Sequence, residues 1–128
     1  MVEKITKGIK VSVEARYEGS FLKDHMLHYA FVYKINIENQ SKDSVQVLSR
    51  HWKVIESTNR PQYVNGDGIV GKKPVVRPGE IHHYQSGCLL TSPIGNMSGT
   101  YVMINFSTSR KFNVKIPGFK LNVPYILN

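Results

Sequence analysis

Apolar and polar residues alternate along most of this chain. In the clearest runs, apolar side chains occupy every second position from 9 to 17, from 29 to 37 and from 112 to 116, with charged or polar residues between most of them. Successive side chains of a β-strand point to opposite faces, so a period of two predicts strands with one buried face and one wet face. No segment shows the period typical of an amphipathic helix.

Turn signals separate these alternating segments. Gly19-Ser20 breaks the first run, Lys23-Asp24 lies in the loop after it, and polar or proline-containing turns follow at 39–44, 59–61 and 91–96. We predict strands over residues 9–17, 29–37, 45–57, 62–70, 81–90, 101–106 and 112–116, a short extended piece at 75–76, and an extended, packed tail at 119–128. This number and spacing of strands favours an all-β fold. We expect an immunoglobulin or fibronectin type III-like β-sandwich of about seven antiparallel strands, in one domain over residues 1–128.

The segment 45–57 alternates less cleanly than the others. Leu48, Trp52 and Val54 share one face, but strict alternation would place Arg50 beside them. Two explanations remain open from the residues alone. Either a β-bulge shifts the register within the strand, or Arg50 lies near the rim and stacks on Trp52.

Residues 66–71 read G-x-G-x-x-G, a spacing associated with nucleotide phosphates. In dinucleotide-binding folds this run opens a helix whose N-terminus meets the pyrophosphate. Here Pro74 and Pro78 follow closely, and proline interrupts a helix. We therefore predict that no helix starts after Gly71 and that the glycines shape a bend between extended segments.

The same loop is our candidate ligand site. Backbone N–H groups at glycines can form a nest for an anion, and cationic side chains follow directly. The candidate residues are Gly66, Gly68, Gly71, Lys72, Lys73 and Arg77. The alternative interpretation is purely structural, with glycines chosen for positive φ or for close backbone approach. Arg50, His51 and Trp52 are secondary candidates that we expect to be structural.

Several segments together resemble the ApaG family along nearly the whole chain. They are HYAFVYKINIEN at 28–39, VQVLSRHW at 45–52, GDGIVG at 66–71, Lys73-Pro74, Pro78-Gly79-Glu80, YQSG at 84–87, GNMSGTY at 95–101 and FNVKIPGF at 112–119. The resemblance implies a fibronectin type III-like sandwich. It also implies a domain that stands alone in bacteria and is attached to F-box or polymerase-associated proteins in eukaryotes, as an interaction module. Bacterial members are linked genetically to cobalt resistance and magnesium efflux, without an established mechanism, and the family offers no catalytic residues to carry over.

Charge and composition add a preference for anionic partners. The formal net charge is +8, and the only acidic residues after position 58 are Asp67 and Glu80. Such a balance favours contact with a nucleotide, a nucleic acid or an acidic protein surface, although a solvated surface would look the same. A single cysteine, Cys88, excludes an intramolecular disulfide, and neither a secretory signal nor a long apolar run is present. We therefore expect a cytoplasmic protein that is not inserted in a membrane.

Metal binding and catalysis find little support in the sequence. His82 and His83 are adjacent on a predicted strand, so their side chains face opposite ways and cannot share one ion. Cys88 would be a nucleophile only if His51 or His82 lay near it in space, and a lone strand cysteine is typically a small buried apolar residue. We predict no metal site, no cofactor and no enzymatic activity. We also do not expect nucleic acid as a partner, because the aromatic residues fall on inner strand faces.

The sequence thus predicts a small binding module with a protein partner of unknown identity. The alternative is a phosphate or pyrophosphate (nucleotide) site on the loop 66–77. Self-association through an exposed edge strand is also left open.

Overall fold

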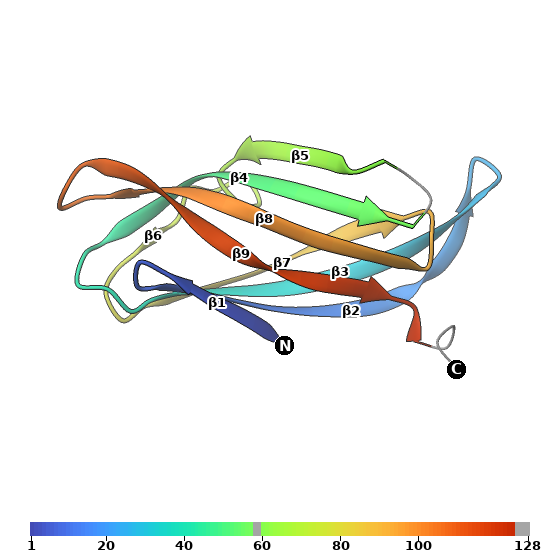
Figure 1. Cartoon of the computed structure of the whole chain (residues 1–128), viewed down its shortest axis with the longest axis horizontal. Coiled ribbons are helices and arrows are strands. Elements are labelled where there is room, and N and C mark those ends of the chain that lie inside the picture. The colour runs from blue at the N-terminus through green and yellow to red at the C-terminus, as the bar shows by residue number, and fades with distance from the viewer. Residues whose placement is uncertain (58–59, 125–128) are drawn as a thin grey trace.

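The chain folds into two antiparallel sheets packed face to face. The structure, a computed structural model, describes residues 1–57 and 60–124. The first sheet has the order β1 (Val2–Thr6), β2 (Ile9–Lys23), β3 (Met26–Asn39) and β7 (Ile81–Leu90). The second has the order β5 (Gln62–Asp67), β4 (Val45–Glu56), β8 (Ile94–Asn105) and β9 (Arg110–Asn122), with β6 (Val75–Val76) pairing the start of β4. Figure 1 shows the second sheet in front of the first.

This strand order confirms the predicted all-β, fibronectin type III-like sandwich. The chain passes from one sheet to the other between β3 and β4, between β6 and β7, and between β7 and β8. Such crossings interleave the strands of the two sheets, as in Greek-key sandwiches. Among the described residues, no helix is long and apolar enough to cross a bilayer.

The core lies between the sheets and is built from the alternating apolar positions. Ile9, Val11, Ile35 and Ile37 of the first sheet are completely buried. At one level of the core, the ring of Tyr33 lies 5.5 Å from Trp52 and 5.7 Å from Phe119, between ring centroids. Burying each side chain of this size contributes about 1.5–3 kcal/mol, so the alternation itself supplies most of the driving force for folding.

The segment 45–57, in which the alternation is irregular, contains a β-bulge. The bulge was the first of the two explanations given above, and Arg50 stacking on Trp52 at the rim was the second. Val47 pairs with Met103 and Ser49 with Val102, so Leu48 is an extra residue in β4. The bulge reverses the alternation. Before it, Val47 points into the core; after it, Arg50 and Trp52 share the inner face, where Arg50 pairs with Tyr101.

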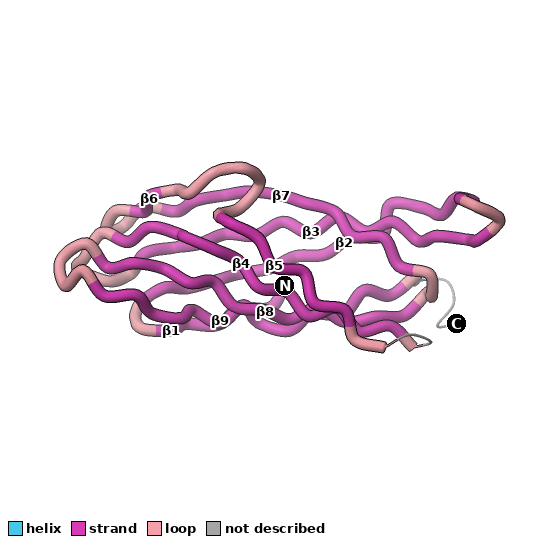
Figure 2. Tube along the Cα trace, turned by 90° about the horizontal axis from the view of Figure 1, so that it is seen from above, coloured by secondary structure: helices cyan, strands magenta, loops and turns pink. Residues whose placement is uncertain are grey.

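The N-terminal half departs from the predicted boundaries most clearly at β1 and β2, and β3 begins at Met26, three residues before its predicted start. The strand β1 was not predicted, because Val2 and Ile5 are exposed and give no core-facing pattern. The predicted break at Gly19 and the loop assignment of Lys23 are wrong. The strand β2 absorbs Gly19 as a bulge with φ 130° and continues to Lys23, and the turn itself is made by Asp24 and His25. The resulting hairpin extends beyond the rest of the sandwich (Figure 2).

The largest differences from prediction in the C-terminal half are at three strand boundaries. The strand β5 ends at Asp67, three residues before the predicted end. The strand β8 begins at Ile94, within the predicted loop 91–96. The strand β9 runs through Pro117 to Asn122, so the packed tail is partly strand. Parts of the predicted turn at 59–61 and of the tail, residues 59 and 125–128, lie outside the described residues.

The glycine run forms a tight turn and not the start of a helix, as predicted. Ile69 donates its N–H to the carbonyl oxygen of Lys72 at 2.7 Å, and Lys72 donates back to Ile69 at 3.0 Å. Between them Val70 and Gly71 both have positive φ, 47° and 76°, as in type I′ turns. Ile69 itself is buried in the core. The apolar side chain of Ile69 therefore anchors the loop to the sandwich.

Gly68 has no room for a side chain in this turn. Its φ is 59°, and a Cβ atom there would clash with the carbonyl oxygen of Lys72. Gly71 also has positive φ but open space around it. We predict that Gly68→Ala lowers the free energy of unfolding by about 2–5 kcal/mol, and Gly71→Ala by about 1–2 kcal/mol, because only the first adds a clash to the backbone strain. Urea denaturation of both variants measures this difference, and equal losses would contradict the geometry.

Candidate functional site

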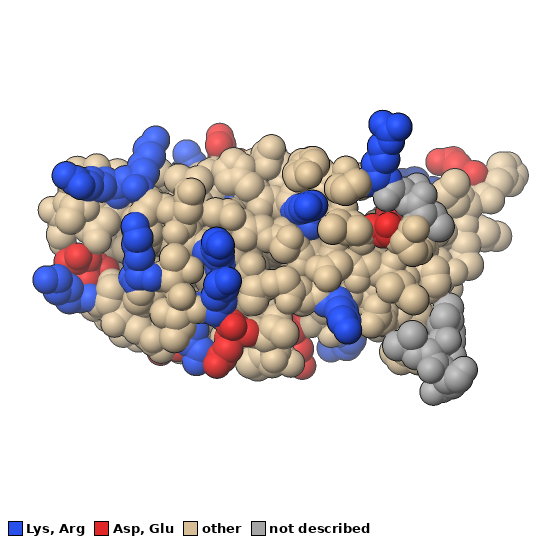
Figure 3. Space-filling view, viewed as in Figure 1, with Lys and Arg blue, Asp and Glu red and all other residues tan. Residues whose placement is uncertain are grey.

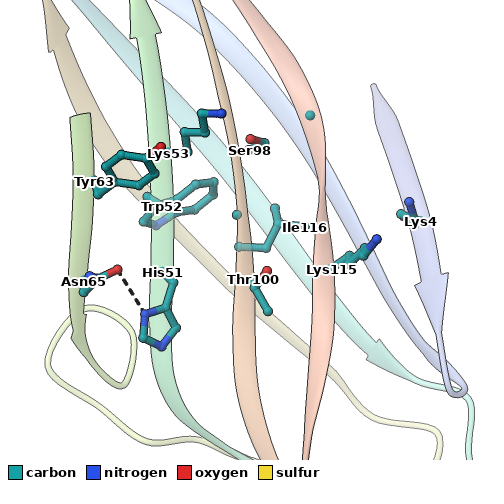
Figure 4. Close-up of a pocket in the computed structure, with 12 residues that line it drawn as sticks. Lys4, His51, Trp52, Lys53, Tyr63, Asn65, Ser98, Thr100, Lys115 and Ile116 are labelled. Carbon is teal, nitrogen blue, oxygen red and sulfur yellow. Dashed lines mark hydrogen bonds between the residues drawn. The ribbon is translucent and has the colours of Figure 1, made fainter. Parts of the chain in front are cut away.

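A groove of about 490 Å³ crosses the outer face of the second sheet. Its lining comes from five strands: Lys4 of β1; His51, Trp52 and Lys53 of β4; Tyr63 and Asn65 of β5; Ser98, Gly99 and Thr100 of β8; and Lys115, Ile116 and Gly118 of β9. Figure 4 shows the lining residues across the sheet, with β5 on one side and β1 on the other. A surface built from this many strands depends on the sandwich being folded.

A bulge in β9 hollows this face. Met97 pairs with Phe119 and Gly99 with Ile116, so two residues of β9, Pro117 and Gly118, face Ser98 alone. Proline has no N–H to donate to a neighbouring strand, and a bulge is where a sheet accommodates it. A Cβ atom on Gly99 would meet the carbonyl oxygen of His51 and lie 3.0 Å from the Trp52 ring. Gly99 therefore lets β8 pass close to the backbone of His51 and to the Trp52 ring.

The groove is basic. Its lining includes Lys4, Lys53 and Lys115 and no acidic residue. Within residues 1–57 and 60–124, the ion pairs are Lys10 with Glu3 and Arg16 with Glu18, so none of the groove lysines is neutralised by a partner. Figure 3 shows the same face of the molecule, with Lys and Arg side chains spread over it and fewer acidic ones. An anionic partner would meet several uncompensated positive charges here.

Hydrogen bonds hold one wall of the groove in place, and the edge strand β5 forms its rim. The Nδ1 atom of His51 lies 3.0 Å from Oδ1 of Asn65, and its Nε2 atom lies 3.1 Å from the hydroxyl of Ser49. These contacts hold the imidazole between β4 and β5 (Figure 4). Tyr63 of β5 is 68% exposed and has its ring on the groove side. The strand β5 lies at the edge of its sheet, and edge strands offer backbone groups for pairing with another chain.

The structure gives the predicted loop residues a mainly structural setting. Gly68 donates its N–H to the carbonyl oxygen of Leu48 at 2.7 Å. Ile69 and Lys72 also donate to each other's carbonyl oxygens. Three backbone N–H groups of the loop, those of Gly68, Ile69 and Lys72, therefore donate to backbone carbonyl oxygens. Gly66 makes room for Arg50, since a Cβ atom there would lie 2.7 Å from its Nη1. These contacts support the structural interpretation of Gly66 and Gly68, while ligand binding at the loop stays a prediction.

The cationic residues of the loop are exposed and only partly gathered. Lys72 and Lys73 are adjacent and exposed, and Lys72 lies close enough to His82 to help lower the pKa of that imidazole, after the larger effect of its burial. Arg77 is exposed as well, but its backbone N–H donates to the Glu80 carboxylate at 2.8 Å. That carboxylate places a negative charge in the same turn and offsets the attraction of Arg77 for an anion.

The histidines and Cys88 form no reactive group in the described part of the chain. No group of three or more His, Cys, Asp or Glu side chains there is arranged to hold a metal ion. His51 lies on the outer face of its sheet, whereas Cys88 packs against the core. Burial raises the pKa of the Cys88 thiol to about 11, and the nearby Glu56 carboxylate adds to the shift. A thiolate at Cys88 is therefore disfavoured at neutral pH.

The groove was missed from the sequence, except for His51 and Trp52 as secondary candidates. Lys4, Lys53, Tyr63, Asn65 and Lys115 each read as an ordinary solvated position. A signal did exist. Gly99 and Pro117-Gly118 interrupt segments that form strands, and such interruptions mark bulges or close approaches within a sheet.

Comparison with known proteins places this architecture in a family. A family model described as the ApaG domain matches residues 20–105. The chain belongs to the ApaG family. A protein named ApaG from Methylobacterium sp. (strain 4-46) is 40% identical over 126 residues, which cover 98% of this chain and 96% of that protein.

Two solved structures extend the likeness to the ApaG fold. A Bordetella pertussis protein named ApaA superposes with a TM-score of 0.79 at 38% identity, over 91% of this chain and 94% of that one. A structural-genomics target solved by X-ray crystallography reaches 0.86 at 32% identity, over 91% and 88% of the two chains. The predicted resemblance to ApaG is confirmed.

The raised pKa of Cys88 makes a measurable prediction. The shift from 9.0 to about 11 lowers the thiolate fraction of the folded chain at pH 8 by about 100-fold relative to an unperturbed thiol. We expect a chromogenic disulfide reagent to react with the native chain about 100-fold more slowly than with the chain in guanidinium chloride. The native rate should climb as the pH rises toward 11. Equal rates at pH 8 would contradict the raised pKa, and a faster native rate would show an activated cysteine.

Proposed function

We propose that this ApaG-family chain is a non-enzymatic binding module that holds an acidic, extended segment of a partner protein in the groove of its second sheet. The observation that carries the proposal is the charge of the groove: Lys4, Lys53 and Lys115 line it, with no acidic side chain among its residues. A segment rich in glutamate or aspartate complements this surface in sign.

The shape of the groove supports an extended ligand. It runs across neighbouring strands, is open to solvent, and ends beside the edge strand β5. An extended segment that reaches this end of the groove can also pair with the free edge of β5, as peptides do when they add a strand to a sheet. The exposed ring of Tyr63 would supply the apolar contact, because tyrosine buries much area at little entropic cost.

A nucleic acid or nucleotide fits this face less well. Binders of single strands stack successive bases on several exposed aromatic rings. In the described part of the groove Tyr63 is exposed, whereas Trp52 is buried in the core. The alternative site, phosphate or pyrophosphate on the loop 66–77, has three of its backbone N–H groups already bonded within the protein. The groove therefore has the stronger support.

Charge reversal in the groove tests the proposal. We expect a fluorescein-labelled peptide of alternating glutamate and threonine to bind, as measured by anisotropy, with an affinity that falls as salt rises. Lys53→Glu and Lys115→Glu should each weaken binding by about three- to tenfold, because each replaces an attraction by a repulsion in an exposed site. A peptide with lysine in place of glutamate should not bind.

Lys23→Glu is the matched control. Lys23 is an exposed lysine in the hairpin of β2 and β3, outside the groove, and its reversal changes the net charge by the same amount. Binding should survive this change almost unaltered. Equal losses in the Lys23→Glu and Lys115→Glu variants would reduce the effect to overall charge and contradict a groove-specific site. Loss caused by Lys72→Ala/Lys73→Ala alone would move the site to the loop.

A further inference from the structure

A second cavity lies inside the sandwich, on the opposite side of β4 from the groove. Its volume is about 120 Å³. It opens between β7, the edge strand of the first sheet, and the glycine loop that follows β5. The residues that line it are Tyr33, Arg50, Trp52, Val70, Tyr84 and Ser86. For a cavity between two sheets, this lining is unusually polar, and its one charge is positive.

The guanidinium of Arg50 has no carboxylate partner among the described residues. The hydrogen bonds that the structure shows use only Nη1, which donates to the carbonyl oxygens of Asp67 at 3.0 Å and Gly68 at 3.1 Å. A guanidinium carries five N–H donors, so Nη2 and Nε keep capacity for a ligand. A partly buried cation is normally paired with an anion, because removing its water without a counter-charge is costly.

Hydroxyl groups complete the wall opposite this cation. The hydroxyls of Tyr84 and Tyr101 are hydrogen-bonded to each other, and Tyr33 is bonded to Ser86. Burial raises the pKa of Tyr33, Tyr84 and Tyr101 above the usual range, so these groups stay protonated and remain donors at neutral pH. When the deeper Tyr101 donates to Tyr84, the hydrogen of Tyr84 is free to donate into the cavity.

The loop over the cavity is strained at one residue. Val70 has φ 47°, a left-handed conformation that a β-branched side chain rarely adopts, and it is 60% exposed. Its exposure means that core packing does not compensate the strain. Backbone strain of this kind is concentrated at ligand clamps and switch loops, where it is part of how the ligand is bound. Val70 is also the residue through which the loop lines the cavity.

We propose that this cavity binds a small oxyanion, the phosphoryl or carboxylate group of a ligand, on Arg50 and the hydroxyl of Tyr84. Charge-assisted bonds from a guanidinium to such an oxyanion are among the strongest in proteins. The volume equals the share of about four water molecules in liquid water, so a single phosphate or carboxylate fits and a whole nucleotide does not. Arg50 and Lys53 lie on opposite faces of β4, and Trp52 is a lining residue of both the cavity and the groove.

Trp52 provides the readout. It is the single tryptophan of the chain, and it lines both the cavity and the groove, so variants of each site accompany the titration. At constant ionic strength, we expect inorganic phosphate or acetate to change the Trp52 fluorescence with saturation, at a dissociation constant of about 1–10 mM. Tighter binding of phosphate identifies a phosphoryl ligand, and tighter binding of acetate identifies a carboxylate ligand. A chloride titration that reproduces the same change would overturn the proposal, as would no saturation up to ten times this concentration.

Conservative variants separate this cavity from other sites. Tyr84→Phe should weaken binding by about tenfold or more, because it deletes one donor to a charged group and leaves the ring in place. Ser86→Ala, a milder change in the same lining, should also weaken binding and serves if Tyr84→Phe does not fold. Tyr63→Phe, in the groove, should have no effect. Weakening by Lys72→Ala/Lys73→Ala without weakening by Tyr84→Phe or Ser86→Ala would place the anion on the loop, outside the cavity, and refute the cavity site.

Discussion

The register of β4 is the constraint on which both sites depend. This strand is paired on both sides, and its extra residue, Leu48, reverses which side chains face the core. Without the bulge, strict alternation from Val47 would direct Trp52 to solvent, because a shift of one residue exchanges the two faces of a strand. With it, Arg50 and Trp52 lie inside, while His51 and Lys53 line the outer groove. The bulge thus allows one strand to contribute side chains to the core, to the cavity and to the groove.

The glycine run is best understood through Arg50. Gly66 leaves space for the guanidinium, whose Nη1 bonds two carbonyl oxygens of the loop, and Ile69 anchors the loop in the core. A phosphate-binding loop of the same spacing presents its N–H groups to a ligand. Here the chain instead presents carbonyl oxygens to its own cation. The spacing of the glycines therefore indicates only that the backbone of this loop can adopt unusual conformations. The contacts around the glycines decide whether the loop binds a ligand or holds Arg50.

Alternation was enough to predict the sandwich and most of its strands, because burial on one face dictates a period of two. It failed where other forces decide. The strand β1 forms from exposed residues, Gly19 is absorbed by a bulge, and β9 continues through Pro117 because the mismatch with Ser98 accommodates it. The groove was beyond prediction for a different reason. Lys4, Lys53 and Lys115 lie far apart in sequence, and only the pairing register of the strands brings them to one surface.

We propose above all that the basic outer face of the second sheet binds acidic segments. Amide chemical shifts recorded by NMR during titration with a glutamate-rich peptide test it residue by residue. We predict shifts concentrated at His51, Lys53, Tyr63, Thr100 and Lys115, with little change on the outer face of β2 and β3. Shifts confined to residues 66–77, or spread evenly over both sheets, would contradict it.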